Sequence, residues 1–126
     1  MPLAGQSASG NIYPSRFVKK SGAFTVAQAG AGEAAIGISQ EGSKDAPLPG
    51  NSTLAAVSGD PLRVYADGDV CLLEAGATVA AGAYIKSDTN GKATTAASTN
   101  PYFAICERGG DENEKLVVLV KYGITP

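Results

Sequence analysis

Turn-forming residues interrupt this chain roughly every 8 to 12 positions, and that spacing constrains the fold more than any other feature. Of the 126 residues, 16 are glycine and 7 are proline, and asparagine or aspartate accompanies many of them. Glycines also break the alanine-rich stretches, so no window keeps a helical apolar period over about three turns. The apolar runs between the turns are short and rich in valine, isoleucine and tyrosine, which favours strands.

These segments predict an all-β domain, a small β-barrel or β-sandwich of short antiparallel strands. The Asn90-Gly91 pair predicts a hairpin across residues 87–92, because both residue types tolerate a positive φ. At most one short helix is expected, around residues 51–58 or 98–103, and residues 41–52 are expected to be loop. The predicted strands cover residues 16–19, 24–28, 35–39, 62–65, 70–74, 84–86, 102–107 and 116–122.

The clearest strand is the last one, which is apolar without interruption from Leu116 to Val120. One face of a small antiparallel sheet normally meets water, so a strand that is apolar on both faces indicates a central position or a subunit contact. The same sequence at an exposed edge would promote aggregation. We predict a central core strand, with a subunit contact as the alternative.

Residues 1–15 differ from the rest because they are small, polar and glycine-rich, without periodicity. They predict an extended N-terminal arm, followed by one β domain over residues 16–126. Fifteen extended residues reach about 50 Å, enough to lie on a neighbouring subunit; a free tail is the alternative. The candidate contact residues, in and just after this arm, are Ile12, Tyr13, Arg16 and Phe17.

Small residues make up much of the apolar fraction. The chain is 44% hydrophobic, yet it has no tryptophan and 3 phenylalanines, so each buried side chain removes little area from water. A partner surface would add burial, which favours oligomerisation.

Charge and hydropathy limit the expected partners. The net charge is −2, and no basic cluster suits a phosphate backbone, so nucleic acid is not expected. No apolar run approaches the roughly 20 residues of a membrane-spanning helix, and the N-terminus lacks the pattern of a secretory signal. We expect synthesis in the cytoplasm and no membrane partner.

Patterns that carry catalysis or bind cofactors are weak. The chain has no histidine, which removes serine triads and histidine metal sites. Gly30 and Gly32 lack the third glycine and the helix of a nucleotide-binding loop. Asp67, Asp69 and Glu74 do not follow the ligand order of a calcium loop and are predicted to be solvated. We therefore expect no enzyme, no cofactor and no metal.

Two other groups of residues remain. Cys71 and Cys106 lie in apolar stretches and are predicted to be buried free thiols, with a disulfide as the alternative. Residues 107–115 are rich in charge and predict a loop tip, with a charged contact surface as the alternative.

Several blocks of sequence resemble the capsid cement, or head decoration, proteins of tailed bacteriophages. The likeness spans residues 16–122, and its motifs are small residues and turns without a catalytic signature. The blocks are residues 16–19, 24–30, 35–41, 69–73, 75–76, 85–88, 91–93 and 116–120.

The resemblance implies a β-rich structural protein, usually a homotrimer, on the outer surface of the virion. Such a protein stabilises the expanded head by bridging major capsid subunits, so its partners would be the major capsid protein and other copies of itself. The arm of residues 1–15 would reach over adjacent subunits. The family offers no active-site residues to transfer.

Two alternatives stay open. One is a β-rich virion binding module, a head fibre or adhesin, that recognises a glycan of the host surface. The other is a lipoyl-type carrier domain, whose modified lysine would be Lys92, next to the Asn90-Gly91 turn.

Overall fold

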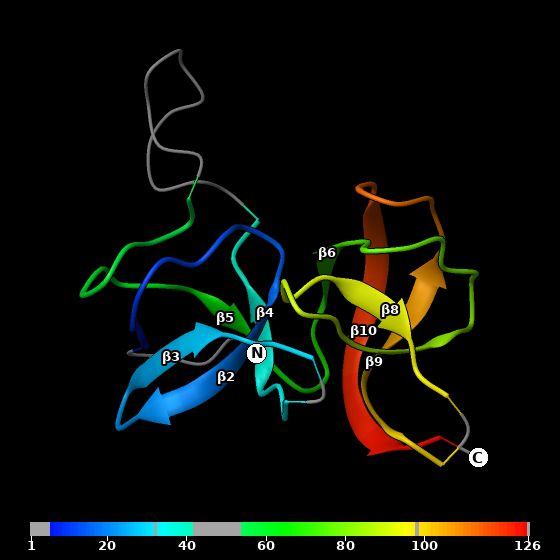
Figure 1. Ribbon diagram of the computed structural model, residues 1–126, viewed down its shortest axis with the longest axis horizontal. Helices are drawn as coiled ribbons and strands as arrows, with labels where there is room; N and C mark the ends of the chain where they lie inside the picture. The colour runs from blue at the N-terminus through cyan, green and yellow to red at the C-terminus, as the bar shows by residue number, and fades with distance from the viewer. Residues whose placement is uncertain (1–5, 32, 42–53, 98, 126) are drawn as a thin grey trace.

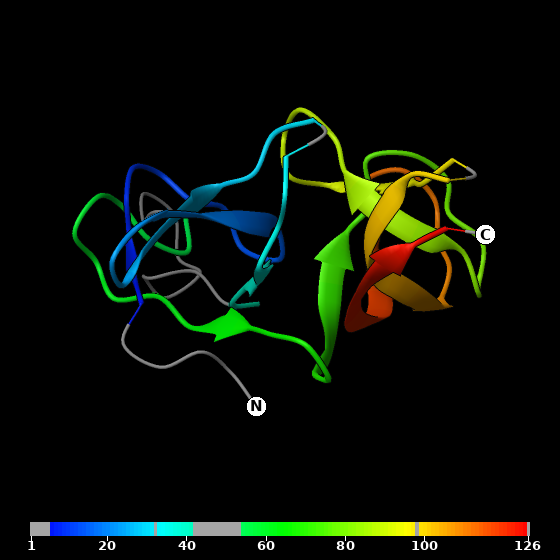
Figure 2. The ribbon, with the colours of Figure 1, turned by 90° about the horizontal axis from the view of Figure 1, so that it is seen from below.

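The protein is all-β, as predicted. The computed structural model describes residues 6–31, 33–41, 54–97 and 99–125, and within these ranges it contains ten strands and no helix. The strands form two five-stranded sheets, which lie side by side along the longest axis of the molecule (Figures 1 and 2). We call residues 6–65 the first lobe and residues 66–125 the second lobe.

The first lobe contains one sheet, with the strand order β1-β3-β2-β4-β5. The pairing of β1 with β3 is parallel and the other pairings are antiparallel. Its strands are β1 (Ser7–Ala8), β2 (Phe17–Gly22), β3 (Thr25–Gln28), β4 (Gly37–Ser39) and β5 (Val64–Tyr65).

The second lobe contains a fully antiparallel sheet, with the order β6-β10-β9-β7-β8. Register shifts along β10 accompany the curl that Figure 1 shows, because bulges bend a strand and increase its twist. Its strands are β6 (Val70–Glu74), β7 (Tyr84–Ser87), β8 (Ala93–Thr95), β9 (Pro101–Arg108) and β10 (Lys115–Ile124).

The last strand is central, as predicted. β10 lies between β6 and β9, and Leu116, Val118 and Val120 on its inner face are fully buried. Val117 and Leu119 on its outer face are half-buried. The hairpin across residues 87–92 is also confirmed, since β7 pairs with β8 from Ser87 to Ala93 and Gly91 has a φ of 76°.

Two apolar clusters form the interior. The smaller cluster lies within the first lobe and includes Ile12 and Val18. The larger cluster fills the inner side of the second sheet, and the first lobe contributes Phe17 and Ile38 to it. The two lobes therefore share one core.

Residues 6–15, predicted to belong to an arm separate from the domain, are part of the first sheet. Ser7 and Ala8 pair with Thr25 and Val26, and Ile12 exchanges backbone hydrogen bonds with Ala56. The boundary predicted after residue 15 thus passes through a hydrogen-bonded unit. Residues 1–5 lie outside the described residues.

The two places where a short helix was expected do not contain one within the described residues. Residues 54–58 are irregular, with an isolated bridge at Ala56, and residues 101–103 begin β9. Residues 42–53, which cover most of the predicted loop, lie outside the described residues. No helix in the described part of the chain is long and apolar enough to cross a membrane.

Candidate functional site

The structure does not bring the four candidate contact residues together on one surface. Ile12 and Phe17 are fully buried, in the smaller and the larger cluster respectively. Tyr13 is exposed, and the Arg16 guanidinium lies 4.8 Å from the centroid of its ring. Ile12 and Phe17 therefore stabilise the chain's own fold, and of the four residues Tyr13 is the exposed one, because the Arg16 side chain is largely buried.

A cluster of charges joins the two lobes. The Glu74 carboxylate, in β6, lies 3.2 Å from the Arg16 guanidinium, 3.1 Å from the Lys92 ammonium and 3.5 Å from the Lys115 ammonium. The side chain of Glu74 is 19% exposed and that of Arg16 is 11% exposed. We call these four residues the Glu74 cluster; one carboxylate there balances part of the charge of three cations.

The surroundings of Glu74 act on its pKa in opposite directions. Burial raises the pKa, because it removes water from the charged form. The hydrogen bond from Lys92 and the charges of Arg16 and Lys115 lower it and prevail, so the pKa of Glu74 lies below its usual value. The carboxylate is thus ionised wherever the protein is folded near neutral pH.

Backbone contacts reinforce the same junction. The Phe17 amide donates to the Gly91 carbonyl at 2.7 Å, and the Glu74 amide donates to the Ser15 carbonyl at 2.9 Å. The Arg16 guanidinium donates to the Asn90 carbonyl at 2.9 Å. A Cβ at Gly91 would lie 3.2 Å from the Phe17 carbonyl oxygen, so glycine serves both the turn and this close approach.

A groove of about 640 Å³ is lined by residues of both lobes. Ile36, Phe103 and Tyr122 form its apolar wall, and the Tyr122 hydroxyl donates a hydrogen bond to the Ile36 carbonyl. Lys20 and Asp67 are the charged residues in its lining. The rings of Phe103 and Tyr122 meet edge to face, with centroids 6.2 Å apart, which fixes both side chains.

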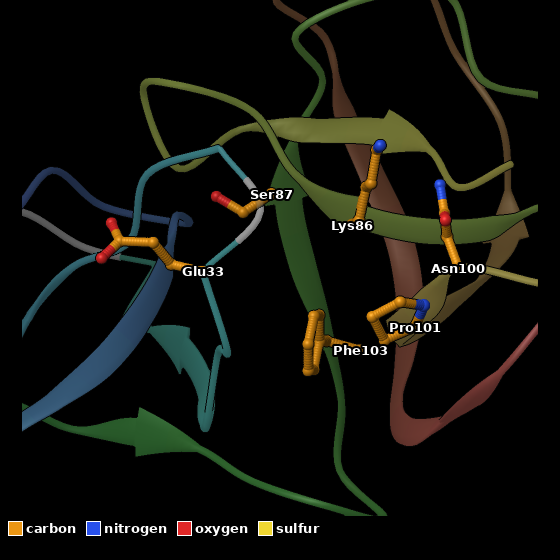
Figure 3. A pocket seen from close by; sticks show the side chains of 6 residues that line it. All are labelled: Glu33, Lys86, Ser87, Asn100, Pro101 and Phe103. Atoms are coloured by element: carbon orange, nitrogen blue, oxygen red, sulfur yellow. The ribbon is translucent and has the colours of Figure 1, made fainter.

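A smaller pocket of about 200 Å³ also has Phe103 in its lining. Figure 3 shows the Phe103 ring between the lobes, with Glu33 on the first-lobe side. The Glu33 carboxylate accepts hydrogen bonds from Lys19 and from the Gly30 amide, which lower its pKa. The partners that hold the Glu33 carboxylate, Lys19 and the Gly30 amide, thus belong to its own lobe.

The described residues offer no cluster that could hold a metal ion. Glu74, one of the three acidic residues considered for calcium, belongs to the Glu74 cluster, whose cations occupy both of its oxygens.

Cys71 and Cys106 are buried free thiols, as predicted. Both are cross-strand partners of Val118, on opposite sides of β10. Two strand spacings separate their Cα atoms by about 9.6 Å, beyond the roughly 7 Å that a disulfide spans. Burial first, and the charges of Glu41 and Asp69 second, raise the pKa of Cys71 to about 12, so its thiol is a poor nucleophile.

The fold is similar to that of a phage protein. The N base of head fibre gp8.5 of bacteriophage phi29 superposes with a TM-score of 0.55 over 92% of this chain and 90% of that chain, with 15% sequence identity. No protein-family model and no curated protein matches the sequence. At this identity the likeness concerns the fold.

Sequence reasoning missed the groove and the Glu74 cluster. Ile36, Phe103 and Tyr122 come from segments far apart in the chain, and the topology alone brings them together. Glu74 was considered with Asp67 and Asp69 and predicted to be solvated, whereas its side chain is 19% exposed and lies against three cations. Nothing in the sequence indicated that Arg16 would face it.

Proposed function

We propose that this chain is a structural protein of a phage virion, a capsid cement protein that binds the outer surface of the head and bridges major capsid subunits. The single observation that carries the proposal is the fold, which matches the base of a phage head fibre over nearly the whole length of both chains. The sequence resemblance to cement proteins supports it independently. The proposed role involves no catalysis, cofactor, nucleic acid or membrane.

A cement protein would stabilise the head because many copies bind one lattice and each copy is rigid. Each copy buries a modest area, but many copies act together on one lattice, and such multivalent contacts stabilise a shell strongly. A protein that binds the expanded shell and not its dissociated subunits shifts the equilibrium toward the shell. The shared core and the Glu74 cluster suit this role, because a bridge must transmit force between its two lobes. The working form is proposed to be a homotrimer.

Heads purified from virions that lack this protein provide the test. We expect the added chain to bind them at a fixed ratio to the major capsid protein, measured by quantitative mass spectrometry. We also expect the decorated heads to stay intact at a higher temperature, or at a higher chelator concentration, than undecorated heads. Absence of saturable binding, or binding without a gain in head stability, would contradict the cement role.

The groove between the lobes favours a second candidate, a virion module that binds a host-surface glycan. Rigid aromatic rings with polar groups at the rim are typical of ligand sites, and Phe103 and Tyr122 with Lys20 and Asp67 meet that description. We expect such a module to give a glycan-array signal that Tyr122→Ala abolishes and Ile124→Ala retains. An array without a reproducible signal argues against this candidate.

The lipoyl-type carrier is not proposed. A carrier lysine must swing freely on its hairpin, whereas the Lys92 ammonium lies 3.1 Å from Glu74 and 2.8 Å from the Asn113 amide oxygen. Its side chain is 19% exposed.

A further inference from the structure

The hairpin between β2 and β3 ends in an exposed tip, which extends from the first lobe away from the second (Figure 1). We call residues 20–24 the β2–β3 tip; every one of them is exposed. The largest is Phe24, whose exposed fraction of 68% exceeds that of every other large apolar residue in the described chain. Its ring adds little to the fold.

The backbone of Phe24 is in the left-handed region, with a φ of 58°. Glycine and asparagine are the usual residues at such a turn position, and a bulky side chain there costs free energy. Ser7 holds this conformation, since its amide and its hydroxyl both donate to the Phe24 carbonyl, at 2.9 Å and 3.3 Å. The tip thus presents an aromatic ring in a fixed direction although the fold would be more stable without it.

Lys20 adds a positive charge to the tip. Its ammonium lies 6.0 Å from the centroid of the Phe24 ring and 3.0 Å from the Gln6 amide oxygen, and both partners are uncharged. Lys19 and Arg16, by contrast, pair with Glu33 and Glu74. Residues 6–31 contain no acidic side chain, and Asp67 of the second lobe is the acidic residue that lines the groove together with Lys20. Neither the Gln6 nor the Phe24 contact neutralises the ammonium, so a carboxylate of a partner can approach it.

We propose that the β2–β3 tip is an anchor that inserts the Phe24 ring into an apolar pocket of the shell protein, with a carboxylate of that protein beside Lys20. This inference rests on the proposed function, which supplies the shell as the partner. A projecting, preformed aromatic residue next to a cation is the arrangement of a hot spot that fills a pocket on another protein. A sugar, by comparison, would need a groove or platform to lie on.

Binding to purified heads that lack the protein tests the anchor. We expect Phe24→Asn to weaken binding by at least about tenfold, with a melting temperature no lower than that of the unmodified chain, because asparagine accepts the left-handed conformation. The matched control, Ile124→Asn, removes a side chain that is 65% exposed on the second lobe and should bind normally. Lys20→Gln should weaken binding at low salt and lose its effect at high salt, where charges are screened.

A photo-crosslinking phenylalanine analogue at position 24 identifies the partner directly. We expect a covalent adduct with the major shell protein, located by mass spectrometry, and none from the same analogue at position 124. Adducts with a second copy of this chain or with no protein, or normal binding by Phe24→Asn, would overturn the anchor and leave the cement role standing. Failure of the unmodified chain to bind heads would overturn both.

Discussion

Replacing Phe17 with alanine is expected to lower the free energy of unfolding by about 3–5 kcal/mol, the range seen when a large aromatic side chain is removed from a packed core. Phe17 is fully buried and belongs to the first lobe, yet it packs in the larger cluster with the second sheet. Its ring also meets Phe103 edge to face, with centroids 6.5 Å apart. The loss should therefore loosen the junction between the lobes as well as the core.

Urea unfolding, followed by circular dichroism, measures the effect. Phe24→Ala is the matched control, because it removes the same ring from an exposed position and should change stability by no more than about 0.5 kcal/mol. A protein of this size has a typical stability of about 5–15 kcal/mol, so Phe17→Ala could unfold it outright. Phe17→Leu, with an expected loss of about 1–2 kcal/mol, keeps the comparison measurable. Equal losses for Phe17 and Phe24 variants would contradict the shared core.

The second large effect is expected for Glu74→Gln, at about 2–4 kcal/mol of lost stability. The substitution keeps the shape of the side chain but leaves Arg16, Lys92 and Lys115 without their shared carboxylate. Two of these cations are largely buried, so their repulsion is only partly screened by water. Glu112→Gln makes the same change of charge on an exposed loop residue and should be close to neutral.

The difference in stability between the unmodified protein and Glu74→Gln is expected to shrink as the pH falls. The pKa of Glu74 is lowered in the folded protein, so the unfolded chain binds its proton first as the pH falls. The stability that Glu74 contributes is complete above its unfolded pKa of about 4.3, and it is lost as the pH falls through the lower folded pKa. Unmodified protein and Glu74→Gln should thus converge in stability at acid pH. A difference that persists unchanged to pH 2 would refute the ionic origin.

Much of the fold could be predicted from the local pattern of the sequence. The spacing of turns predicted the all-β class, the run from Leu116 to Val120 predicted a central strand, and Asn90-Gly91 predicted the β7–β8 hairpin. Each of these depends on neighbours in the chain. Burial of Cys71 and Cys106 was equally local, because each lies within an apolar strand.

The features that decide the candidate sites depend on contacts between distant segments. Residues 6–15 have no strand pattern of their own, and β1 forms because β3 offers it a parallel partner. Ile12 and Phe17 were predicted to be contact residues because they are apolar and lie in or just after a polar arm, whereas the topology places both in cores. For Phe24, the local pattern predicted the first residue of a strand, whereas the structure places it in a left-handed turn.

The shared core also sets an order of events during synthesis. The ribosome makes Phe17 and Ile38 long before β9 and β10, whose side chains bury them. The nascent first lobe therefore carries uncovered apolar side chains until the last strand emerges, and the decisive pairings are far apart in sequence. Pairings of this kind form slowly, over roughly milliseconds to seconds, so the residues that were translated first stay uncovered until β9 and β10 have been made and have paired.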